Sequence, residues 1–425
     1  LTYQNTFIFD LLTANVKQIL LLSTICCLFI FEENLLRQQI NNFEYFILIL
    51  CAVLGLLFLV SSYDLISMYL AIEMQSLCLY VLAASKKNSS FSTEAGLKYF
   101  LLGSFSSALL LFGMSILYGC TGTTNFENYT ILFSGVDVST FSTSESISIA
   151  LLFVGAAFFF KIAAAPLHMW SPDVYEGSPT SSTIFFAVIP KIALFAVFIR
   201  MFQTVFSSFE DTLLIMSIFF SICSVIVGSF AALRQRKLKR LLAYSSVSHV
   251  GYLLLAFSSN SLEGTHALFF YLVIYMITSL SLWSVILSIN TSTNIERSKT
   301  LIDFASVSSL NPLIGLTGMI ALFSLAGVPP LAGFYAKMVI FLSALSSGLV
   351  LVSLIAILAS VISSVYYIRL IKIMYFEPKS DVSFVFPVTR SCSLMMGSGT
   401  FFLIYLFINP PLLLLLTEKM ALCLY

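Results

Sequence analysis

Residues 311–347, NPLIGLTGMIALFSLAGVPPLAGFYAKMVIFLSALSS, decide the fold class of this chain. The stretch is apolar over a length well beyond the roughly 20 residues that a helix needs to cross a bilayer core. The segment GVPPLAG at 327–333 interrupts it, and proline lacks the backbone N–H that continues a helix. In lipid, such a break is tolerated only where it is buried in protein or lines a cavity. The stretch therefore predicts a broken membrane helix within a larger bundle.

The composition of the whole chain indicates the same class. Of its 425 residues, 59% are hydrophobic and only 10% are charged, too few charged groups to cover the surface of a soluble protein of this size. We therefore predict an all-α polytopic membrane protein with about twelve transmembrane helices. The predicted spans are 16–31, 43–61, 64–84, 97–120, 146–168, 182–206, 211–233, 241–258, 265–289, 311–347, 349–369 and 395–417. The fifth span runs into Pro166, Pro172 and Pro179, so we expect a second broken helix there.

The basic residues of the loops test this number of spans. Most lysines and arginines outside the spans fall in odd-numbered loops, including the dense run RQRKLKR at 234–240. Three lie on the other side: Lys17, Arg200 and Lys419. This asymmetry follows the positive-inside rule and places both chain ends on the less basic side. The fifth loop is an exception because Asp173 and Glu176 have no base beside them, so we expect it to fold back into the protein.

Several functional classes lack support in the sequence. The net charge of +1 gives no electrostatic footprint for nucleic acid. The eight cysteines fall mostly in apolar runs without C-x-x-C spacing, which predicts neither a zinc site nor a disulfide framework. No nucleotide-binding loop, Rossmann fingerprint or catalytic triad is visible. The energy for any transport must then come from an ion gradient or from partner subunits.

Four ionisable side chains within long apolar stretches point to function: Glu73, Lys161, Lys191 and Lys337. Each costs roughly 2.5–3.5 kcal/mol near the bilayer centre, and intramembrane charges commonly mark ion or proton paths. Buried lysines in general can exchange a proton near neutral pH. The four residues therefore predict a proton-transfer axis. The alternatives are a neutral packing role for the glutamate and lysines that extend their amines to the membrane interface.

The three histidines, His168, His249 and His266, show no spacing typical of metal ligands. Taken singly, each fits a hydrogen-bonded core residue. His249 follows the hydroxyl-rich segment SSVS at 245–248, and a mid-span histidine beside hydroxyls can pass protons along a wet path. Simple packing between helices remains the alternative for it.

Several long motifs occur in order along the chain. They are SYDL at 62–65 with YLAIEMQSL at 69–77, FKIAAAPLHMWSPDVYEGSPT at 160–180, KRLLAYSSVSHVGY at 239–252, and LAGVPPLAGF at 325–334 with Lys337. Together they resemble the chain 2 family of proton-pumping NADH:quinone oxidoreductase, respiratory complex I. The resemblance covers nearly the whole chain, and the length of the motifs makes it specific.

The resemblance implies an antiporter-like fold with two inverted five-helix repeats around a hydrophilic axis. The broken stretches are the fifth and tenth predicted spans, an offset that such repeats require. We expect 1–62 to form N-terminal helices, 63–206 the first repeat, 207–378 the second repeat and 379–425 a C-terminal helix. Longer family members carry about two further spans before the point where Leu1 aligns, and we expect these two N-terminal helices to be absent here.

The resemblance also implies roles for the buried charges. Glu73 corresponds to the glutamate that couples to the adjacent subunit, and Lys161 corresponds to its partner. Lys191 corresponds to the connecting lysine, and Lys337 to the lysine of the second half-channel. Two further positions of the polar axis match histidines: His168 and His249.

The implied assembly supplies the redox chemistry. NADH, FMN, iron–sulfur clusters and ubiquinone would act elsewhere in the complex, with no cofactor on this chain. The implied partners are other membrane-arm subunits, including a neighbouring antiporter-like subunit and a small subunit facing Glu73, and phospholipids such as cardiolipin. The motif spelling and the abundance of Phe and Ser indicate a multi-pass protein of the mitochondrial inner membrane, with a bacterial membrane as the alternative.

Two other functions are compatible with this fold. A subunit of a cation/proton antiporter would use the same fold and similar buried lysines. A structural spacer of the membrane arm would have lost transport. The retained axial charges argue against the spacer, because apolar replacements of buried charges are often more stable.

Overall fold

The computed structural model describes residues 5–38, 43–134, 144–289, 300–305, 307–377 and 388–424, and these residues fold as helices joined by short connections. The α-helices are α1 (Leu11–Arg37), α2 (Phe43–Ser61), α3 (Leu65–Ala83), α4 (Ser90–Thr121), α5 (Phe126–Phe133), α6 (Ser144–Ile162), α7 (Trp170–Gly177), α8 (Thr180–Ile199), α9 (Glu210–Leu233), α10 (Leu238–Ser258), α11 (Leu262–Ser288), α12 (Val307–Leu310), α13 (Pro312–Ala326), α14 (Ala332–Ser346), α15 (Val350–Phe376), α16 (Arg390–Ile408) and α17 (Pro411–Leu422). A π-helical turn, η2 (Arg200–Val205), extends α8, and two short 3-10 turns are η3 (Ser207–Phe209) and η4 (Leu301–Phe304).

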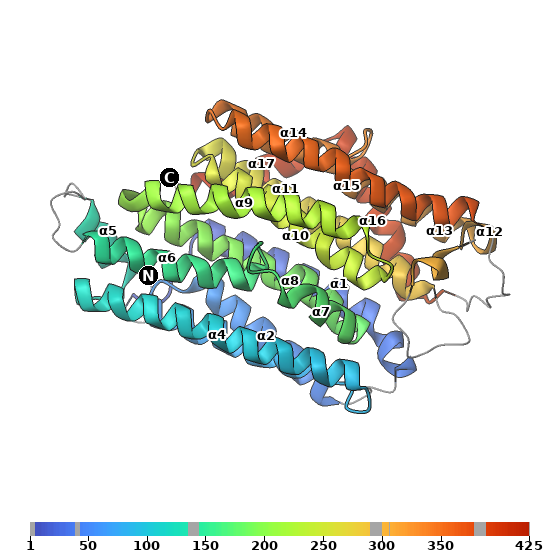
Figure 1. Cartoon of the computed structure of the whole chain (residues 1–425), viewed down its shortest axis with the longest axis horizontal. Coiled ribbons are helices and arrows are strands. Elements are labelled where there is room, and N and C mark those ends of the chain that lie inside the picture. Colours follow the sequence, from blue (N-terminus) through green and yellow to red (C-terminus); the bar gives the residue numbers. More distant parts are fainter. Residues whose placement is uncertain are drawn as a thin grey trace.

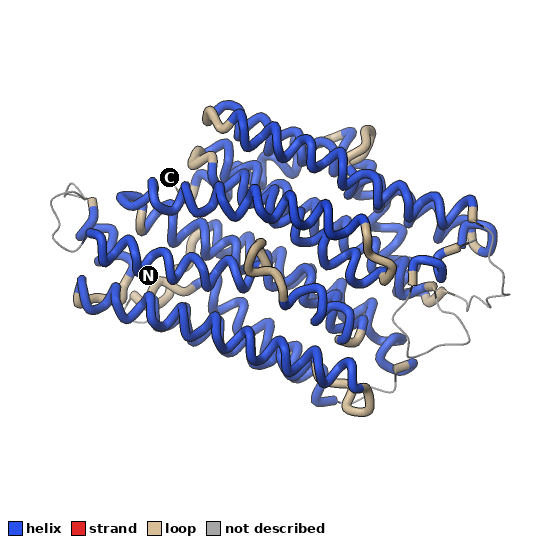
Figure 2. The backbone as a smooth tube through the Cα atoms, viewed as in Figure 1, coloured by secondary structure: helices blue, strands red, loops and turns tan. Residues whose placement is uncertain are grey.

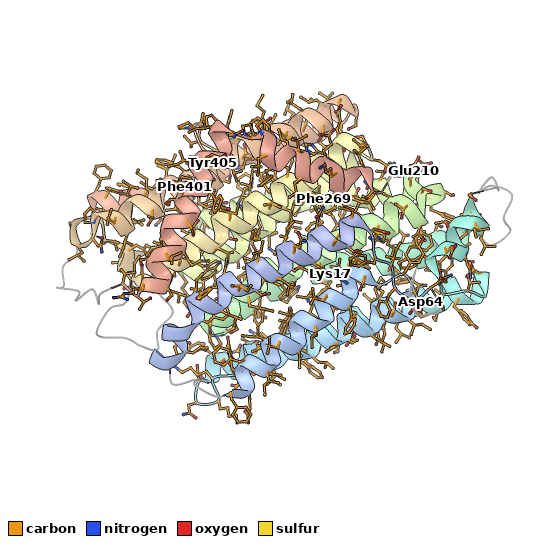
Figure 3. The ribbon with its side chains drawn as sticks, turned by 180° about the vertical axis from the view of Figure 1, so that it is seen from behind. Lys17, Asp64, Glu210, Phe269, Phe401 and Tyr405 are labelled. Atoms are coloured by element: carbon orange, nitrogen blue, oxygen red, sulfur yellow. The ribbon has the colours of Figure 1, made fainter. Side chains whose placement is uncertain are left out.

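The helices lie side by side in one elongated bundle, with α4 along one edge and α14 and α15 along the other (Figure 1). Three central helices, α8, α10 and α11, are almost wholly buried, whereas α15 and α16 expose most of their apolar surface. Phe401 and Tyr405, for example, stack on the outer part of α16 (Figure 3). An apolar exterior around a buried, more polar centre is the arrangement expected of a protein whose solvent is lipid.

The predicted spans are confirmed in number. Among the described residues, eleven helices are long and apolar enough to cross a membrane. The interrupted pair α13 and α14 supplies the remaining predicted span. Both chain ends lie at the same end of the bundle, as the loop charges predict (Figure 1). Asp64 and Glu210 lie toward one common end as well (Figure 3).

The break within 311–347 is confirmed, and local signals explain its form. α13 begins at Pro312 because the Asn311 side chain accepts hydrogen bonds from the next free backbone N–H groups, those of Leu313 and Ile314. It ends at Ala326, and the next residue, Gly327, has a φ of 84°, a left-handed conformation that glycine adopts without a steric penalty. α14 then starts five residues later at Ala332.

The predicted break after 146 is also confirmed. α6 ends at Ile162, a loop follows, and α7 starts at Trp170. This loop lies part of the way along the bundle rather than at its end (Figure 2). Trp170 Nε1 donates to the carbonyl of Phe160 at 2.9 Å, which ties α7 to the last turn of α6.

One span is wrong in detail. A single helix over 395–417 was expected, but α16 ends at Ile408 and α17 starts at Pro411. Consecutive prolines after Asn409 remove two backbone donors, so a continuous helix cannot pass this point. Proline at the first position of α17 is well tolerated because that N–H has no partner within a helix.

The fifth loop folds into the protein, as its unmatched acids suggested. Its helix α7 packs against α4 and α10. Asp173 Oδ1 lies 3.1 Å from Arg240 Nη2, and Asp173 Oδ2 lies 3.3 Å from Lys98 Nζ. Glu176 pairs with Lys237 and with Arg240. The bases that match these acids therefore come from α4 and from the start of α10, at the same basic end.

The repeat boundaries remain a prediction. Residues 207–378 contain five spans: α9, α10, α11, the pair α13 and α14, and α15. Residues 63–206 contain four: α3, α4, the pair α6 and α7, and α8. A matching set of five in the first half would start with α2, and the boundary at 378 and 379 lies outside the described residues.

Candidate functional site

Glu73 and Lys161 lie in a polar group between α3 and α6. One oxygen of Glu73, Oε1, is buried without a hydrogen-bond partner in the described part of the chain, and Ser76 Oγ approaches Oε2 at 3.5 Å. Lys161 Nζ donates to Tyr80 Oη at 3.3 Å. Glu73, Ser76 and Tyr80 recur at helical spacing along α3, so they share one face of it.

The expected Glu73–Lys161 pairing is not a direct ion pair. Within the described ranges no contact of 4.0 Å or less joins the two charges, although Glu73 is close enough to attract the Lys161 amine. Tyr80 contacts the amine in its place. The lysine is therefore free to change partner without breaking a strong contact.

Lys191 lies in the centre of the bundle on α8. Its side chain is 5% exposed, and Nζ has no hydrogen-bond partner among the residues the structure describes. The amine lies 5.3 Å from the ring centroid of Tyr275 on α11. A charged amine buried with so little compensation costs several kcal/mol. The charge state of Lys191 therefore depends strongly on nearby charges and on any water that enters.

His249 connects α10 to two neighbouring helices. Its Nδ1 lies 2.6 Å from Tyr271 Oη, and its Nε2 lies 3.0 Å from Tyr367 Oη. The imidazole is 4% exposed, and the Tyr275 ring centroid lies 5.2 Å from its own. A neutral imidazole has one donor and one acceptor nitrogen, so one tyrosine donates to it and the other accepts. Such a chain of hydrogen bonds can pass a proton.

Lys337 lies on α14 just after the second break. Its Nζ donates at 2.9 Å to the carbonyls of Leu325 and Ala326, the last two residues of α13. The carbonyl end of a helix carries partial negative charge and attracts cations. The Tyr252 ring centroid lies 5.4 Å from the same amine. The broken helix thus supplies Lys337 with its own acceptors.

One contact recurs at Lys161, Lys191 and Lys337. Each amine lies between 5.3 and 5.8 Å from the centroid of a tyrosine ring, Tyr80, Tyr275 or Tyr252. A cation over an aromatic face is stabilised by roughly 0.5–2 kcal/mol, more when it is desolvated. The sequence analysis missed these tyrosines. Tyr80 follows Glu73 by seven residues and Tyr252 follows His249 by three, but the same helical spacing is common in ordinary cores.

The other two histidines lie away from this group. His168 is partly exposed in the loop between α6 and α7, and the Tyr244 ring centroid lies 6.1 Å from its own. Among the residues that the structure describes, its Nδ1 has no hydrogen-bond partner. His266 contacts the carbonyl of Leu414 on α17 at 3.3 Å. The geometry therefore joins His249 to the central residues and leaves His168 beside the first break.

Known proteins resemble this chain in sequence. A family profile described as "NADH:quinone oxidoreductase/Mrp antiporter, TM" matches residues 62–363. The chain is 46% identical to "NADH-ubiquinone oxidoreductase chain 2" of Marchantia polymorpha, over 99% of this chain and 85% of that protein. It is 40% identical to "NADH-quinone oxidoreductase subunit N" of Paramagnetospirillum magneticum, over 94% of this chain and 81% of that protein.

Solved structures agree on the fold. A chain of respiratory complex I from Thermus thermophilus superposes with a TM-score of 0.82 at 30% identity, covering 97% of this chain and 87% of that one. A chain of the Mrp complex from Dietzia sp. DQ12-45-1b superposes with a TM-score of 0.87 at 21% identity, covering 99% and 84%. The second likeness concerns the fold alone. With its broken helices and buried lysines, this chain belongs to the membrane-subunit family shared by NADH:quinone oxidoreductase and Mrp antiporters.

Proposed function

We propose that this chain is a proton-translocating membrane-arm subunit of NADH:ubiquinone oxidoreductase, respiratory complex I. The observation that carries the proposal is the series of buried lysine, tyrosine and histidine side chains in a chain 46% identical to a protein named as that enzyme's chain 2. Residues Glu73, Lys161, Lys191, His249 and Lys337 would carry protons in turn. His168, in the loop of the first break, would belong to the same proton-transfer axis.

The proposed mechanism transfers charge stepwise. A charge that moves in the neighbouring subunit attracts or repels Glu73, and the balance between Glu73 and Tyr80 around the Lys161 amine changes. Lys191, which has no hydrogen-bond partner among the described residues, then gains or loses a proton through water. The Tyr271–His249–Tyr367 chain conducts the proton toward Lys337, which releases it.

The electron transfer that drives this movement would occur on other subunits. NADH, FMN, iron–sulfur clusters and ubiquinone would bind there. Among the described residues, no three His, Cys, Asp or Glu side chains gather as metal ligands would. The proposed partners are the neighbouring antiporter-like subunit, a small subunit facing Glu73, and phospholipids such as cardiolipin.

We further propose that the membrane is the mitochondrial inner membrane. The relative from Marchantia polymorpha carries a ubiquinone-type name and is 46% identical, whereas the bacterial relative is 40% identical. The basic loops, such as 234–240, would then face the matrix.

A cation/proton antiporter subunit is the second candidate, favoured by the superposition on the Mrp complex. Native membranes solubilised in mild detergent and resolved on a native gel separate the two. Migration of this chain in a band of roughly megadalton size with NADH dehydrogenase activity is expected. A small complex that exchanges Na⁺ for H⁺ without NADH would instead establish the antiporter.

A further inference from the structure

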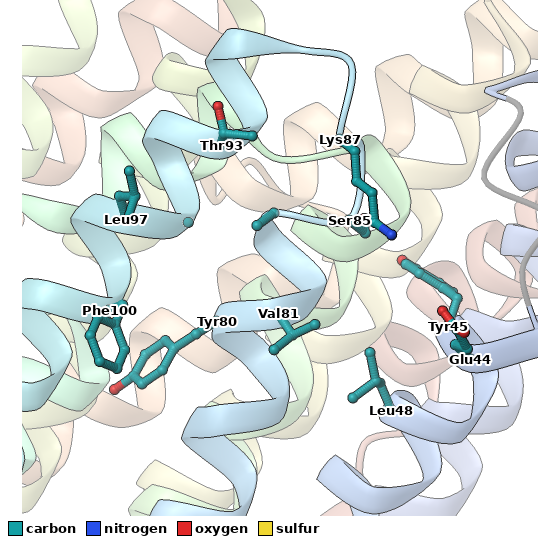
Figure 4. Close-up of a pocket in the computed structure, with 12 residues that line it drawn as sticks. Glu44, Tyr45, Leu48, Tyr80, Val81, Ser85, Lys87, Thr93, Leu97 and Phe100 are labelled. Carbon is teal, nitrogen blue, oxygen red and sulfur yellow. The ribbon is translucent and has the colours of Figure 1, made fainter.

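A cavity of about 550 Å³ opens between α2, α3 and α4, at the basic end of the bundle. Leu48, Val81, Leu97 and Phe100 form apolar parts of its wall (Figure 4). Val81, Leu97 and Phe100 are 53%, 63% and 46% exposed and lie on spans, so they face lipid. In a membrane, such a groove is filled by hydrocarbon rather than by water.

Polar side chains gather at one end of this cavity. Glu44, Tyr45, Ser85 and Lys87 lie together there, whereas Tyr80 and Phe100 lie at the other end (Figure 4). Ser85 Oγ is shielded from solvent and has no hydrogen-bond partner in the described part of the chain. A buried hydroxyl left without a partner is costly, so an acceptor or donor from outside the chain fits this position.

The two charges at this end have opposite signs. Glu44 and Lys87 are both exposed, and within the described ranges neither forms an ion pair. A headgroup with one anion and one cation would satisfy both, its phosphate at Lys87 and its ammonium at Glu44. A purely anionic headgroup would leave Glu44 beside a second negative charge.

We propose that this groove is a binding site for one zwitterionic phospholipid with a primary amine, of the phosphatidylethanolamine class. The headgroup sits between Lys87 and Glu44, with its phosphate accepting from the Ser85 hydroxyl. One acyl chain runs along Val81 and Leu97 toward Phe100.

The inner wall of the groove reaches the proton axis. Tyr80 lines the cavity, and the same side chain accepts the hydrogen bond of Lys161. A bound acyl chain holds the Tyr80 ring against the lysine and keeps water away from it. This effect on proton transfer rests on the proposed function, whereas the binding itself does not.

Photolabelling tests the binding. The intact purified complex is incubated with phosphatidylethanolamine that carries a photoreactive group on one acyl chain, and labelled peptides are identified by mass spectrometry. Labels are expected on residues 81–100, and unlabelled phosphatidylethanolamine should displace them. Lys87→Gln and Glu44→Gln each remove one charged contact and should lower labelling about tenfold. Val81→Trp should lower it by filling the groove.

Matched variants separate a site from the general lipid annulus. Lys372→Gln changes an exposed lysine near the C-terminal end of α15, and Leu351→Trp changes a 77% exposed leucine near its start. Both should label residues 81–100 as the unchanged complex does. Equal labelling of α15 and α4, absent labelling of 81–100, or preferential displacement by cardiolipin or phosphatidylglycerol would overturn the proposal.

The effect of the bound lipid on proton pumping is measured in a separate experiment. In proteoliposomes, Lys87→Gln should lower the protons pumped per electron while the NADH oxidation rate changes less. If Lys87→Gln loses the label but pumps normally, the link through Tyr80 is wrong and the binding stands. If the unchanged complex pumps no protons through this chain yet still labels, the proposed function is wrong and the lipid site stands.

Discussion

The two broken helices hold their lysines in opposite ways. Lys337 follows its break and donates to the carbonyl end of α13, the other half of the same span. Lys161 precedes its break and donates to Tyr80 on a different helix. Lys337 is thus stabilised locally, by the helix end that the break creates. Lys161 depends on α3, the helix that carries Glu73, and so it is the lysine that can respond to a change there.

Between them, Lys191 has neither arrangement. Its helix α8 is continuous up to the π-helical turn, and its amine has no hydrogen-bond acceptor among the described residues. The three lysines therefore differ in how strongly neighbouring groups stabilise the charged amine. Lys337 is held most firmly, Lys161 less, and Lys191 least.

The largest effect is expected from a substitution at the second break, where α13 and α14 pack closely. A Cβ on Gly333 would lie 1.9 Å from the carbonyl oxygen of Ser324, backbone that cannot move without separating α13 from α14. Gly333→Ala should therefore abolish accumulation of the assembled complex, measured by native gel. Gly397→Ala, where nothing lies within 4 Å of the added carbon, is the control and should assemble.

The matching glycine substitution at the first break should also lower assembly of the complex, but by less. A Cβ on Gly177, at the end of α7, would lie 2.5 Å from the carbonyl oxygen of Phe91. Gly177→Ala should lower assembly severalfold without abolishing it, because α7 is a short helix that can shift. Normal assembly of Gly333→Ala together with loss of Gly177→Ala would reverse the comparison.

The next effect compares the lysines themselves. Lys337→Met removes two charged hydrogen bonds from the end of α13, each worth roughly 1.5–3 kcal/mol. It should lower both assembly and pumping. Lys161→Met removes one contact to a neutral hydroxyl and should lower pumping while assembly changes little. Thermal stability and proton-to-electron ratio, measured on the same preparations, separate the two. Equal losses of stability would contradict the distinction.

A smaller effect tests the tyrosine that bridges to α3. Tyr80→Phe removes the acceptor of Lys161 but keeps the ring, so the hydrogen bond from the amine to α3 is lost. We expect a severalfold lower pumping efficiency in a fully assembled complex. Tyr118→Phe on the exposed face of α4 serves as the control and should pump normally.

The smallest effect concerns the basic end. Asp173, which is 38% exposed, pairs with Lys98 and Arg240, whereas Glu176 is only 13% exposed. Asp173→Asn should change the amount of assembled complex by no more than about twofold, and less at high salt, because exposed ion pairs are weak and screened. Glu176→Gln should be the more harmful change at every salt concentration. If Asp173→Asn lowered the amount of assembled complex more than Glu176→Gln, the exposed acid would be the more important one for assembly.

Features of the fold that depend on residues close together in the chain could be predicted from the sequence. Apolar length predicts the spans, and GVPPLAG at 327–333 predicts the break. The division at Asn409 was missed although Pro410 and Pro411 were visible signals. The bases that match Asp173 could not be predicted, because Lys98 and Arg240 are distant in the chain.

The tyrosines of the axis show the same limit. Tyr252, Tyr271 and Tyr367 have no local pattern that separates them from tyrosines of an apolar core. The packing of α10 against α11, α14 and α15 brings their hydroxyls and rings to His249 and Lys337. Four axial charges could be named from sequence, but the contacts that distinguish them required the fold.

The most direct test of the central claim is the proton-to-electron ratio of Lys191→Met. The assembled complex is reconstituted in proteoliposomes, and NADH oxidation and proton uptake are measured together, with Lys372→Met as the matched control. The account predicts a lower ratio for Lys191→Met and a normal ratio for the control. A fully assembled Lys191→Met complex that pumps at the normal ratio would contradict it, because a proton path through the bundle could not then depend on this lysine.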